Sequence, residues 1–582
     1  MKTSSFSNRV RIIFGFFIFF TLIIITRLYF LQIVKGEAFS EKADRQYVSV
    51  TVDTFNRGSI FFSGKKDILF SAGTLKSGYI IALNNKNIIS TDIEKYYKEL
   101  SEIIPIEADI FYSKISKKDD PYEEIATHVS EEEVKKIKEL NLSGIIIEKE
   151  KWRYYPGDDL ASRLIGIVGY NGDNIEGRYG LEKYYEDVLA RKDSNLYVNT
   201  FAEIFSNLSN TIKKDKEREG DIITSIDPEV QGYIEKIVSD TNNKWDSKMT
   251  GAVVIDPNTG EIYSMAVSPT FNLNNFKDEK DVSVFANPLI SNAYEMGSII
   301  KPLTMAAGLD TGDVTAKTTY NDKGFLEIDG RTIYNFDKKG RGVVDMQAVL
   351  NNSLNTGVTF VMNKMGKEKF TEYFQKYGIG SETGIDLPNE ASGNIGNILN
   401  NLNNKKQIEY ATASFGQGIS MTPIITVRAL SVLANGGKLI IPHVVNKIDY
   451  QVGLSKNISY VDEAKQVLKK ETSEEISRML VRVVDEALMG GDMKMKNYSI
   501  AAKTGTAQMA RPANEGGGYY SDRWLHSFFG YFPAYNPRFL VFLYTVEPKN
   551  IDYASKTLTE PFFDITKFLI NYYEITPDRS EK

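Results

Sequence analysis

The sequence contains no cysteine and only three histidines, His128, His443 and His526, which lie far apart in the chain. The absence of cysteine excludes disulfides, and three scattered histidines make a zinc site unfavourable. No G-x-S-x-G segment occurs, so the nucleophile elbow of α/β-hydrolases is absent and a Ser-His-Asp triad is disfavoured. The net formal charge of -6 gives no indication of nucleic-acid binding.

The N-terminal region is the one long apolar run. Residues 12–34 form 23 consecutive residues with a single charge, Arg27, which is long enough for a membrane-spanning helix. A cleaved signal peptide is the alternative, but its apolar core is usually shorter and no small-residue cleavage site follows. Three basic residues and no acidic residue precede the run, so the N-terminus is predicted to be cytoplasmic and the rest extracellular or periplasmic.

A chain of 582 residues is too long for one compact domain. The pattern of charged and apolar residues changes at "KKDKEREGD", residues 213–221, which indicates a domain boundary. Before this segment the chain is rich in charge. Ser130 and Glu133 form a predicted capping box, and the charged runs are interpreted as solvated helix faces. A strand is predicted in "SGIIIEKEKWRYYP".

After this segment, "GAVVIDPNTGEIYSMAV" (251–267) predicts a β-hairpin around a Pro-Asn-Thr-Gly turn. Residues 498–510 and 526–546 predict further strands, with helices between the two groups and a packed helix near the C-terminus. We therefore expect an α+β fold whose sheet joins both ends of the domain. The expected parts of the chain are a cytoplasmic tail (1–11), a transmembrane helix (12–34), a charge-rich region (35–220) and a larger α+β domain (221–582).

The segment "YEMGSIIKPLTMAAGLD" (294–310) contains Ser298 and, three residues later, Lys301. A lysine among apolar residues is costly, but a buried lysine near another cation loses its proton and can act as a base. On a helix, residues i and i+3 face each other, so Lys301 could activate the Ser298 hydroxyl. Gly297 allows a tight turn into this helix, and Pro302 fits its first turn.

A lone S-x-x-K is weak evidence, and it recurs at Ser63 and Lys66 in a stretch interpreted as a loop. Two further motifs strengthen it: "NNSLNTG" contains Ser353 and Asn355, and "AAKTGTAQ" contains Lys503, Thr504 and Gly505. S-x-N also recurs at 455–457, outside the expected order. The ordered set S-x-x-K, S-x-N, K-T-G is typical of penicillin-binding proteins and serine β-lactamases.

The sequence resembles class B penicillin-binding proteins, the single-pass peptidoglycan D,D-transpeptidases. The resemblance implies an elongated pedestal of dimerisation type over 35–220 and a transpeptidase domain over 221–582, with a central antiparallel sheet flanked by helices. The resemblance extends over most of the chain through "RLYFLQIVKGEAF", "RGSI", "RYYPGDDLASRLIGIVGYNGDNIEGRYGLEKYYEDVL", "TSIDPEVQ", "YGIGSETGIDLPNE", "SFGQGISMTP" and "FFGYFPAYNP". Three features depart from the family pattern: Met296 replaces the usual proline, Leu354 replaces a common second serine, and "FFSGKKD" replaces an Asp-Arg-Asn-Gly turn.

The resemblance implies catalytic roles for five residues. Ser298 would be the nucleophile that forms the acyl-enzyme and Lys301 its neutral base. Ser353 would relay the proton to the leaving D-alanine, Asn355 would hold the amide of the donor peptide, and Lys503 would maintain positive potential beside Lys301.

Three more residues are implied in substrate binding: Thr504, Gly505 and Thr506. The two threonines would meet the terminal carboxylate, and the backbone N–H groups of Ser298 and Thr506 would form the oxyanion hole. No metal and no cofactor are implied.

The implied partners are peptidoglycan stem peptides, β-lactams and a membrane-embedded glycosyltransferase that polymerises lipid II, of the shape, elongation, division and sporulation family. Arg27 and the pedestal segments "RGSI" and "RYYPGDD" are the features expected to contact it. The alternatives are a D,D-carboxypeptidase or β-lactamase-like hydrolase, a β-lactam sensor and a structural subunit of the wall machinery. Length and pedestal favour a septal over an elongation role.

Overall fold

The computed structural model describes residues 14–15, 18–24, 26–27, 55–88, 92–117, 120–172, 174–191, 219–404 and 406–579. Among these residues no helix is both long and apolar enough to cross a membrane. The tail 1–11 and about half of the predicted membrane-spanning run 12–34 lie outside the described residues, and the described parts of that run are helical. The following concerns the compact unit formed by Asn56–Arg191 and Thr211–Lys582.

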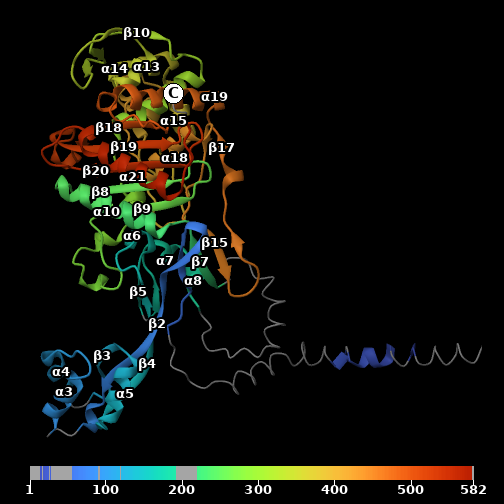
Figure 1. Ribbon diagram of the computed structural model, residues 1–582, viewed down its shortest axis with the longest axis vertical. Helices are drawn as coiled ribbons and strands as arrows, with labels where there is room; N and C mark the ends of the chain where they lie inside the picture. The colour runs from blue at the N-terminus through green and yellow to red at the C-terminus, as the bar shows by residue number, and fades with distance from the viewer. Residues whose placement is uncertain are drawn as a thin grey trace, which may run out of the picture. The chain divides into compact units, whose positions relative to one another are not determined.

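A five-stranded antiparallel sheet forms the centre of the C-terminal region (Figure 1). Its strand order is β18-β19-β20-β8-β9. The strands are β8 (Met249–Ile255), β9 (Ile262–Ser268), β18 (Ala501–Ala510), β19 (Tyr519–Phe532) and β20 (Phe539–Val546). The predicted hairpin is confirmed as β8 and β9, and β20 pairs with β8, so the sheet does join both ends of the domain.

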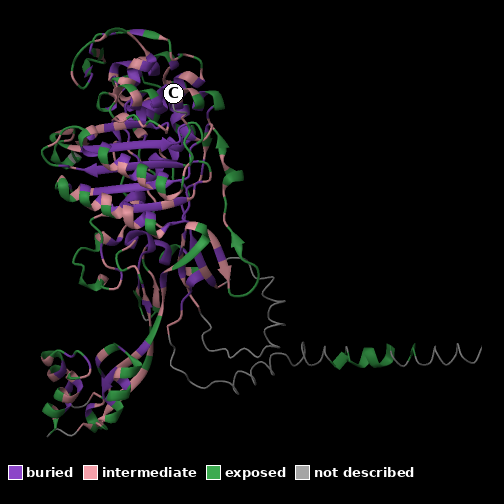
Figure 2. Cartoon of the chain, viewed as in Figure 1, coloured by how far each residue is buried: buried purple, intermediate pink, exposed green. Residues whose placement is uncertain are grey.

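Helices cover both faces of this sheet. Helices α10 (Pro228–Lys244) and α21 (Thr559–Tyr572) pack on one face, and α12 (Lys301–Asp310), α18 (Pro423–Ala434) and α19 (Lys470–Arg482) pack on the other. Every residue of β20 is buried, because helices cover the strand on both sides (Figure 2). Its nearly continuous apolar sequence is typical of a strand buried in this way. The expected antiparallel sheet with flanking helices is therefore confirmed.

Further helices and small sheets complete this region. The helices are α11 (Pro288–Ser291), α13 (Met346–Asn351), α14 (Asn355–Met365), α15 (Lys367–Lys376), α16 (Gly396–Leu399), α17 (Ile408–Ala413) and α20 (Ala554–Thr557). Two-stranded sheets pair β10 (Thr319–Asp322) with β13 (Gly342–Asp345), β11 (Phe325–Ile328) with β12 (Arg331–Tyr334), and β14 (Lys438–Leu439) with β17 (Lys465–Gln466).

A second sheet draws its strands from both halves of the sequence. Its order is β16-β15-β7-β1-β2-β3, and β4 pairs with β2. The strands are β1 (Ile60–Gly64), β2 (Ile68–Leu83), β3 (Glu123–Val129), β4 (Ile145–Tyr154), β7 (Gly220–Thr224), β15 (Val445–Tyr450) and β16 (Lys456–Asn457). The expected boundary at residues 220 and 221 thus falls within β7, which pairs with the pedestal strand β1 on one side and with β15 on the other.

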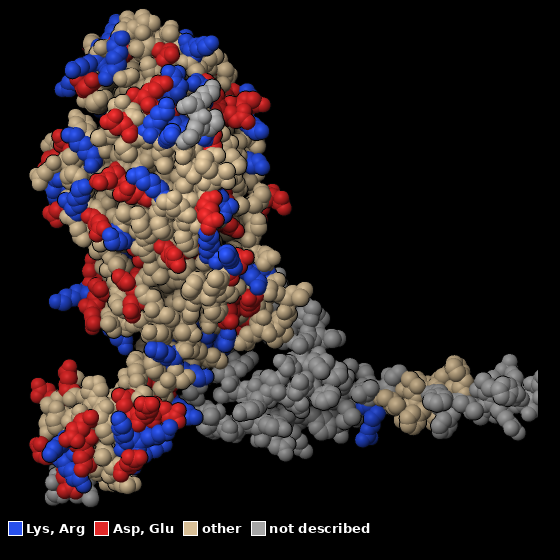
Figure 3. All heavy atoms as spheres, viewed as in Figure 1, with Lys and Arg blue, Asp and Glu red and all other residues tan. Residues whose placement is uncertain are grey.

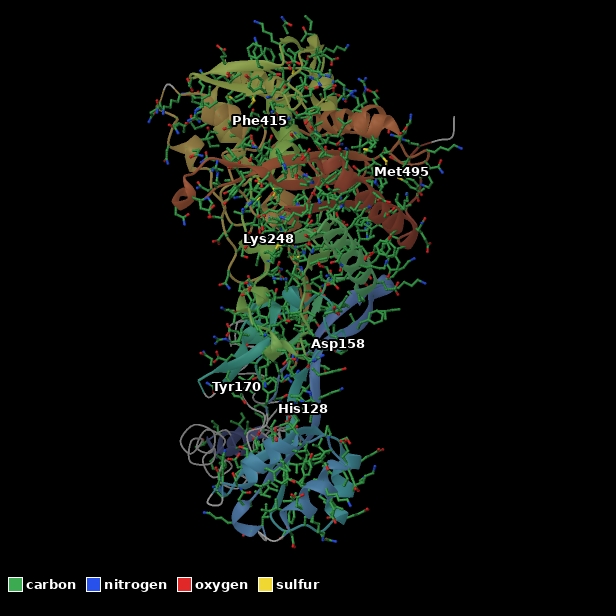
Figure 4. All side chains as sticks on the ribbon, turned by 90° about the vertical axis from the view of Figure 1, so that its left-hand side faces the viewer. His128, Asp158, Tyr170, Lys248, Phe415 and Met495 are labelled. Atoms are coloured by element: carbon green, nitrogen blue, oxygen red, sulfur yellow. The ribbon has the colours of Figure 1, made fainter. Side chains whose placement is uncertain are left out.

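Beyond this sheet, β2 and β4 continue as a long ribbon to a small helical head. The head contains α3 (Ile93–Ser101), α4 (Ala108–Ile115) and α5 (Glu131–Glu139) around its own apolar core. The predicted capping box between Ser130 and Glu133 is confirmed. Charged side chains crowd the surface of the head (Figure 3), as expected for solvated faces. His128, labelled in Figure 4, stacks on Trp152 where the ribbon meets the head.

The second S-x-x-K copy is divided between a strand and the predicted turn. Ser63 lies within β1, and Lys66 is in the hairpin turn between β1 and β2 with a left-handed φ of 64°. The interpretation of Ser63 as a loop residue was therefore wrong. The apolar "IFF" of residues 60–62 favours a strand, and the segment that departs from the family pattern forms the hairpin itself.

The "RGSI" and "RYYPGDD" segments meet in a buried ionic cluster. Glu182, in α7 (Gly180–Tyr184), accepts hydrogen bonds from Arg57 Nε at 2.5 Å and Arg153 Nε at 2.6 Å. Tyr155 O–H donates to the same carboxylate, and Arg57 Nη2 also donates to Glu186 in α8 (Glu186–Leu189). Arg57 is only 2% exposed. The expectation that Arg57 offers a contact surface was wrong, because its guanidinium group is buried in ion pairs with Glu182 and Glu186 inside the pedestal.

Near this cluster, α6 (Ser162–Ile165) and the hairpin of β5 (Val168–Asn171) and β6 (Asn174–Gly177) pack on α7. Arg163 of α6 donates to the carbonyl oxygens of Ala286 and Pro269 in the C-terminal region. Tyr185 O–H donates to Asp386, which also accepts from the backbone N–H groups at the start of β15. The pedestal and the catalytic region are thus tied together by buried polar contacts.

Candidate active site

Ser298 lies in a 3-10 turn, Gly297–Ile300, that runs directly into α12 at Lys301. In a 3-10 turn the side chains of residues i and i+3 eclipse each other, so Ser298 and Lys301 are on one side of the turn. Ser298 was predicted at the N-terminus of a helix that Gly297 opens; in the structure a 3-10 turn holds Ser298 there, and the α-helix itself begins at Lys301. Pro302 is in the first turn of α12, as predicted.

Two glycines allow the backbone to pass close to this turn. Gly297 has a φ of 66°, and a Cβ there would stand 2.8 Å from the carbonyl oxygen of Thr506. Its N–H donates to the carbonyl of Gly416, where a Cβ would stand 2.3 Å from the Gly297 oxygen. Phe415, labelled in Figure 4, is buried just before this second glycine. The "SFGQG" segment therefore supports the serine turn from behind.

Strand β18 borders the same turn along the free edge of the sheet. At Gly505 a Cβ would stand 2.3 Å from Ser527 Oγ and 2.8 Å from the carbonyl oxygen of Met296. Ser527 Oγ itself donates to that Met296 carbonyl at 2.8 Å. Only glycine lets β18 pack this closely on the turn, which is the physical reason for glycine in the K-T-G motif.

Lys301, Ser353 and Lys503 come together although they are distant in sequence. Lys301 Nζ donates to the carbonyl oxygen of Ser353 at 2.5 Å and to its Oγ at 3.1 Å. Lys503 Nζ donates to the same Oγ at 3.0 Å and to the carbonyl of Thr504 at 3.0 Å. The structure thus joins residues of all three motifs around one hydroxyl.

Burial sets the charge of this pair. Lys301 is 1% exposed and Lys503 4% exposed, and no carboxylate among the described residues forms an ion pair with either. Burial, followed by repulsion from Lys503, lowers the pKa of Lys301 well below its ordinary value. Burial lowers the pKa of Lys503 to about 7. Because two ammonium groups are unfavourable here, Lys301, which bears both effects, is the lysine driven neutral.

Ser353 has a strained backbone. Its φ of 53° is left-handed, which is uncommon for a residue other than glycine. It occupies the short connection between α13 and α14, and the following N–H, of Leu354, donates back to Val349. Strain of this kind persists only where surrounding contacts hold it, and it is concentrated at functional sites. No sequence signal indicated this conformation.

Asn355 begins α14, and its Nδ2 donates to the carbonyl of Tyr334 at 2.8 Å. The next residue, Thr356, donates through Oγ1 to Asp322, and its N–H donates to Asn335 Oδ1. Asn335 Nδ2 in turn donates to both Asp322 carboxylate oxygens at 3.0 and 3.1 Å. This buried network fixes the start of α14, and sequence reasoning missed it because its members lie in three separate segments.

The other side chains of the three motifs are partly exposed, in contrast with the two lysines. Ser298, Ser353, Asn355, Thr504 and Thr506 are all of intermediate exposure. Thr506 Oγ1 accepts a hydrogen bond from the backbone N–H of Ala554 at 3.1 Å. These hydroxyl and amide groups are therefore accessible, whereas the two lysines are buried.

Residues 57–225 match the penicillin-binding protein dimerisation domain, and residues 250–566 match the penicillin binding protein transpeptidase domain. The chain belongs to the class B penicillin-binding proteins. Stage V sporulation protein D of Bacillus subtilis (strain 168) is 30% identical over 579 residues, covering 96% of this chain and 85% of the relative. Peptidoglycan D,D-transpeptidase FtsI of Buchnera aphidicola subsp. Baizongia pistaciae is 26% identical, covering 99% and 97%.

Solved penicillin-binding proteins share the fold. The crystal structure of Penicillin Binding Protein 2X from Streptococcus thermophilus superposes with a TM-score of 0.71 at 19% identity, covering 90% of this chain and 81% of that one. A peptidoglycan synthetase from Bifidobacterium adolescentis gives 0.66 at 22% identity, covering 91% and 97%. The mixed α/β architecture with a pedestal is therefore that of this family.

Proposed function

We propose that this class B penicillin-binding protein is a peptidoglycan D,D-transpeptidase that works through an acyl-enzyme on Ser298. The observation that carries the proposal is the convergence of two buried lysines on Ser353 Oγ beside the turn that bears Ser298. A serine hydroxyl needs a base, and a neutral lysine held in a buried site can supply one. Relatives named peptidoglycan D,D-transpeptidase, FtsI among them, support the same assignment.

In the first step, neutral Lys301 takes the proton of the Ser298 hydroxyl as Oγ attacks the carbonyl carbon of the penultimate D-alanine. The C–N bond to the terminal D-alanine breaks. Ser353, hydrogen-bonded to both lysines, passes the proton to the leaving amine. An ester between Ser298 and the donor stem peptide remains.

In the second step, an amine of a neighbouring stem peptide attacks the ester carbonyl. A new amide bond forms, the bond to Ser298 Oγ breaks, and the proton of the attacking amine returns to the serine through the same groups. β-Lactams acylate Ser298 in the first step by opening of their ring. The nitrogen that leaves the carbonyl stays attached to the acyl group and keeps the acceptor amine out, which makes the enzyme their target.

The donor peptide binds along the edge strand β18. Backbone N–H groups of Ser298 and Thr506 form the oxyanion hole for the tetrahedral intermediate. The hydroxyls of Thr504 and Thr506 bind the terminal carboxylate, and Gly505 lets the peptide and the serine turn approach the strand. Asn355 holds the donor's amide.

The assignment of Ser298 is tested by incubating the full-length chain in detergent with a fluorescent penicillin and mapping the labelled peptide by mass spectrometry. We expect the label on Ser298 and its loss in Ser298→Ala. Ser63→Ala is the matched control, because it removes the serine of the second S-x-x-K motif and should keep full labelling. Labelling of Ser63, or undiminished labelling of Ser298→Ala, would refute the assignment.

A hydrolase would use the same residues, so the acceptor must be tested separately. Nascent glycan strands with pentapeptide stems should yield cross-linked dimers in excess over tetrapeptides released by water. The excess of cross-links should disappear when the acceptor amine is acetylated. A product consisting of tetrapeptides alone would favour the carboxypeptidase alternative.

We propose that the apolar run 12–34 is a single membrane span and that the tail 1–11 is cytoplasmic. The pedestal (35–220) and the transpeptidase domain (221–582) would then both lie on the extracellular or periplasmic side. A lipid-II-polymerising glycosyltransferase is the proposed membrane partner, since tethering raises the effective concentration of fresh strands. Replacing 12–34 by an unrelated apolar helix tests this contact by co-purification. Arg57→Glu does not, because Arg57 is buried. If the polymerase still co-purifies with the variant that has the replaced span, residues 12–34 are not part of the interface.

A further inference from the structure

The side chain of Thr506 shares one face of the central sheet with a buried histidine. Thr506 of β18 and His526 of β19 are direct partners in the antiparallel register, so their side chains lie on the same face. Thr545 and Thr250 continue this polar row across β20 and β8. His526 and Thr545 are fully buried, whereas the neighbouring core on this face is apolar. The catalytic mechanism proposed above uses none of the buried members.

The short helix α20 covers the first two members of this row and contacts both. Its first residue, Ala554, donates its backbone N–H to Thr506 Oγ1 at 3.1 Å. Its last residue, Thr557, places Oγ1 3.0 Å from His526 Nδ1 and donates to the Ala554 carbonyl at 3.2 Å. Thr557 is 2% exposed and Ala554 1% exposed. A continuous path of hydrogen bonds therefore runs from His526 through α20 to the hydroxyl of Thr506.

Each hydroxyl in this path has one hydrogen to donate. Where the Thr557 hydroxyl donates to the Ala554 carbonyl, Nδ1–H of His526 donates to Thr557, and in the other tautomer Nδ1 accepts from the Thr557 hydroxyl. Both arrangements join His526 to α20. Burial lowers the pKa of His526 to about 4, partly offset by a hydrogen bond with the backbone of Asp552, so the imidazole is neutral.

Thr506 likewise has a single hydroxyl hydrogen. Its hydroxyl already accepts the Ala554 N–H, and this contact restricts the rotation of the O–H bond. The hydroxyl hydrogen remains free to be donated, and a carboxylate accepts but cannot donate. Thr506 is partly exposed at the free edge of β18, where such an acceptor can reach it.

We propose that His526 and Thr557 are positioning residues that hold α20 in place and thereby orient the Thr506 hydroxyl for donation to the terminal carboxylate of the acyl donor. This inference rests on the proposed function, in which Thr506 binds that carboxylate. Neither His526 nor Thr557 touches the substrate. Their effect is transmitted by the backbone N–H of Ala554 and is specific to the charged end of the donor.

The test compares two donors on the full-length chain in detergent: an acyl-D-alanyl-D-alanine peptide and the methyl ester of its terminal carboxylate. Thr557→Val keeps the shape of the side chain and removes the hydroxyl. For the donor with a free carboxylate, we expect Thr557→Val to raise KM and to lower kcat/KM about tenfold, which corresponds to the loss of one hydrogen bond to a charged group. For the methyl ester, KM and kcat/KM should stay at the parent values. Thr557→Ser should restore the parent values.

The matched control is Thr566→Val. Thr566 is a buried threonine of α21 whose hydroxyl donates to the carbonyl of Phe562, so the same chemical group is lost away from the cleft. It should behave as the parent with both donors. In addition, Thr506→Val combined with Thr557→Val should lose no more discrimination than Thr506→Val alone, because both act on one hydrogen bond.

A second pair of variants covers the case in which Thr557→Val does not fold. His526→Asn offers an amide donor near the place of Nδ1 and should retain discrimination, whereas His526→Phe should lose it. Equal losses for both donors, or additive effects with Thr506→Val, would mean a merely structural role and overturn the inference. If the parent fails to acylate Ser298 with penicillin, the proposed function itself fails. If the parent acylates and Thr557→Val discriminates normally, only this inference fails.

Discussion

Lys301 and Lys503 donate to the same oxygen, Ser353 Oγ, at 3.1 and 3.0 Å. Both ammonium groups are buried, and a hydroxyl is the acceptor that they share. Two cations so placed cannot both keep their protons without a large cost, so the site stabilises the singly charged pair. The geometry thereby supplies the neutral amine that a serine nucleophile requires.

The pH dependence of acylation should report this coupling. In the proposed mechanism Lys301 acts only when neutral, so the rate should be retained above its pKa and lost as the pH falls through it. Lys503→Gln keeps a donor near Ser353 but removes the charge that helps to lower the pKa of Lys301. We expect the acid limb of the pH profile to move to higher pH, measured as the rate of penicillin acylation.

Lys369→Gln is the control for that experiment, since Lys369 pairs with Asp313 at the surface and its loss should leave the profile unchanged. An acid limb at the parental position in Lys503→Gln would show that burial alone sets the pKa of Lys301.

Gly505→Ala should impair acylation with little loss of folded protein. The added Cβ would come within 2.3 Å of Ser527 Oγ and 2.8 Å of the Met296 carbonyl, so β18 must move away from the serine turn. A displacement of this kind at a reacting centre costs on the order of a hundredfold in rate. Stopped-flow acylation with a fluorescent penicillin measures it.

The comparison is Gly232→Ala in α10, where the new Cβ would meet only Leu160 Cδ1, at 3.8 Å. That exchange should leave the rate unchanged and stabilise the helix by up to about 1 kcal/mol, because alanine is the better helix former. Equal rates in the two variants would contradict the close packing of β18 on the turn.

Arg57→Met should destabilise the pedestal strongly. Glu182 would remain buried with one of its two arginine partners, and breaking a buried pair in this way costs about 3–5 kcal/mol. Chemical unfolding followed by tyrosine and tryptophan fluorescence measures the loss. Binding to a membrane partner should be affected only as far as the pedestal unfolds.

Lys236→Met serves as its counterpart, because the Lys236–Asp240 pair is on the surface, with side chains 74% and 64% exposed. Exposed pairs of this kind contribute about 0.5 kcal/mol or less. If both substitutions shift the unfolding midpoint equally, the ionic cluster does not stabilise the pedestal.

Local sequence patterns were sufficient for many elements. Apolar runs around the Pro-Asn-Thr-Gly turn predicted β8 and β9, and the Ser130–Glu133 spacing predicted the start of α5. The pairing of the two ends of the domain could also be inferred, since the remaining strong strand signals lie near residue 540. These signals are carried by residues within a few positions of one another, so they survive without knowledge of the rest of the chain.

The sequence by itself determined which chemical groups are present and in what order: a serine and a lysine three residues apart, then S-x-N, then K-T-G. Their assigned roles stay predictions. Only the tertiary structure decided that Lys301 and Lys503 share the hydroxyl of Ser353. It also decided that Arg57 is buried in an ion pair with Glu182 and that α20 connects His526 to Thr506. The physical reason is that burial and hydrogen-bond partnership depend on residues brought together from distant segments, and no local pattern records which segments will meet.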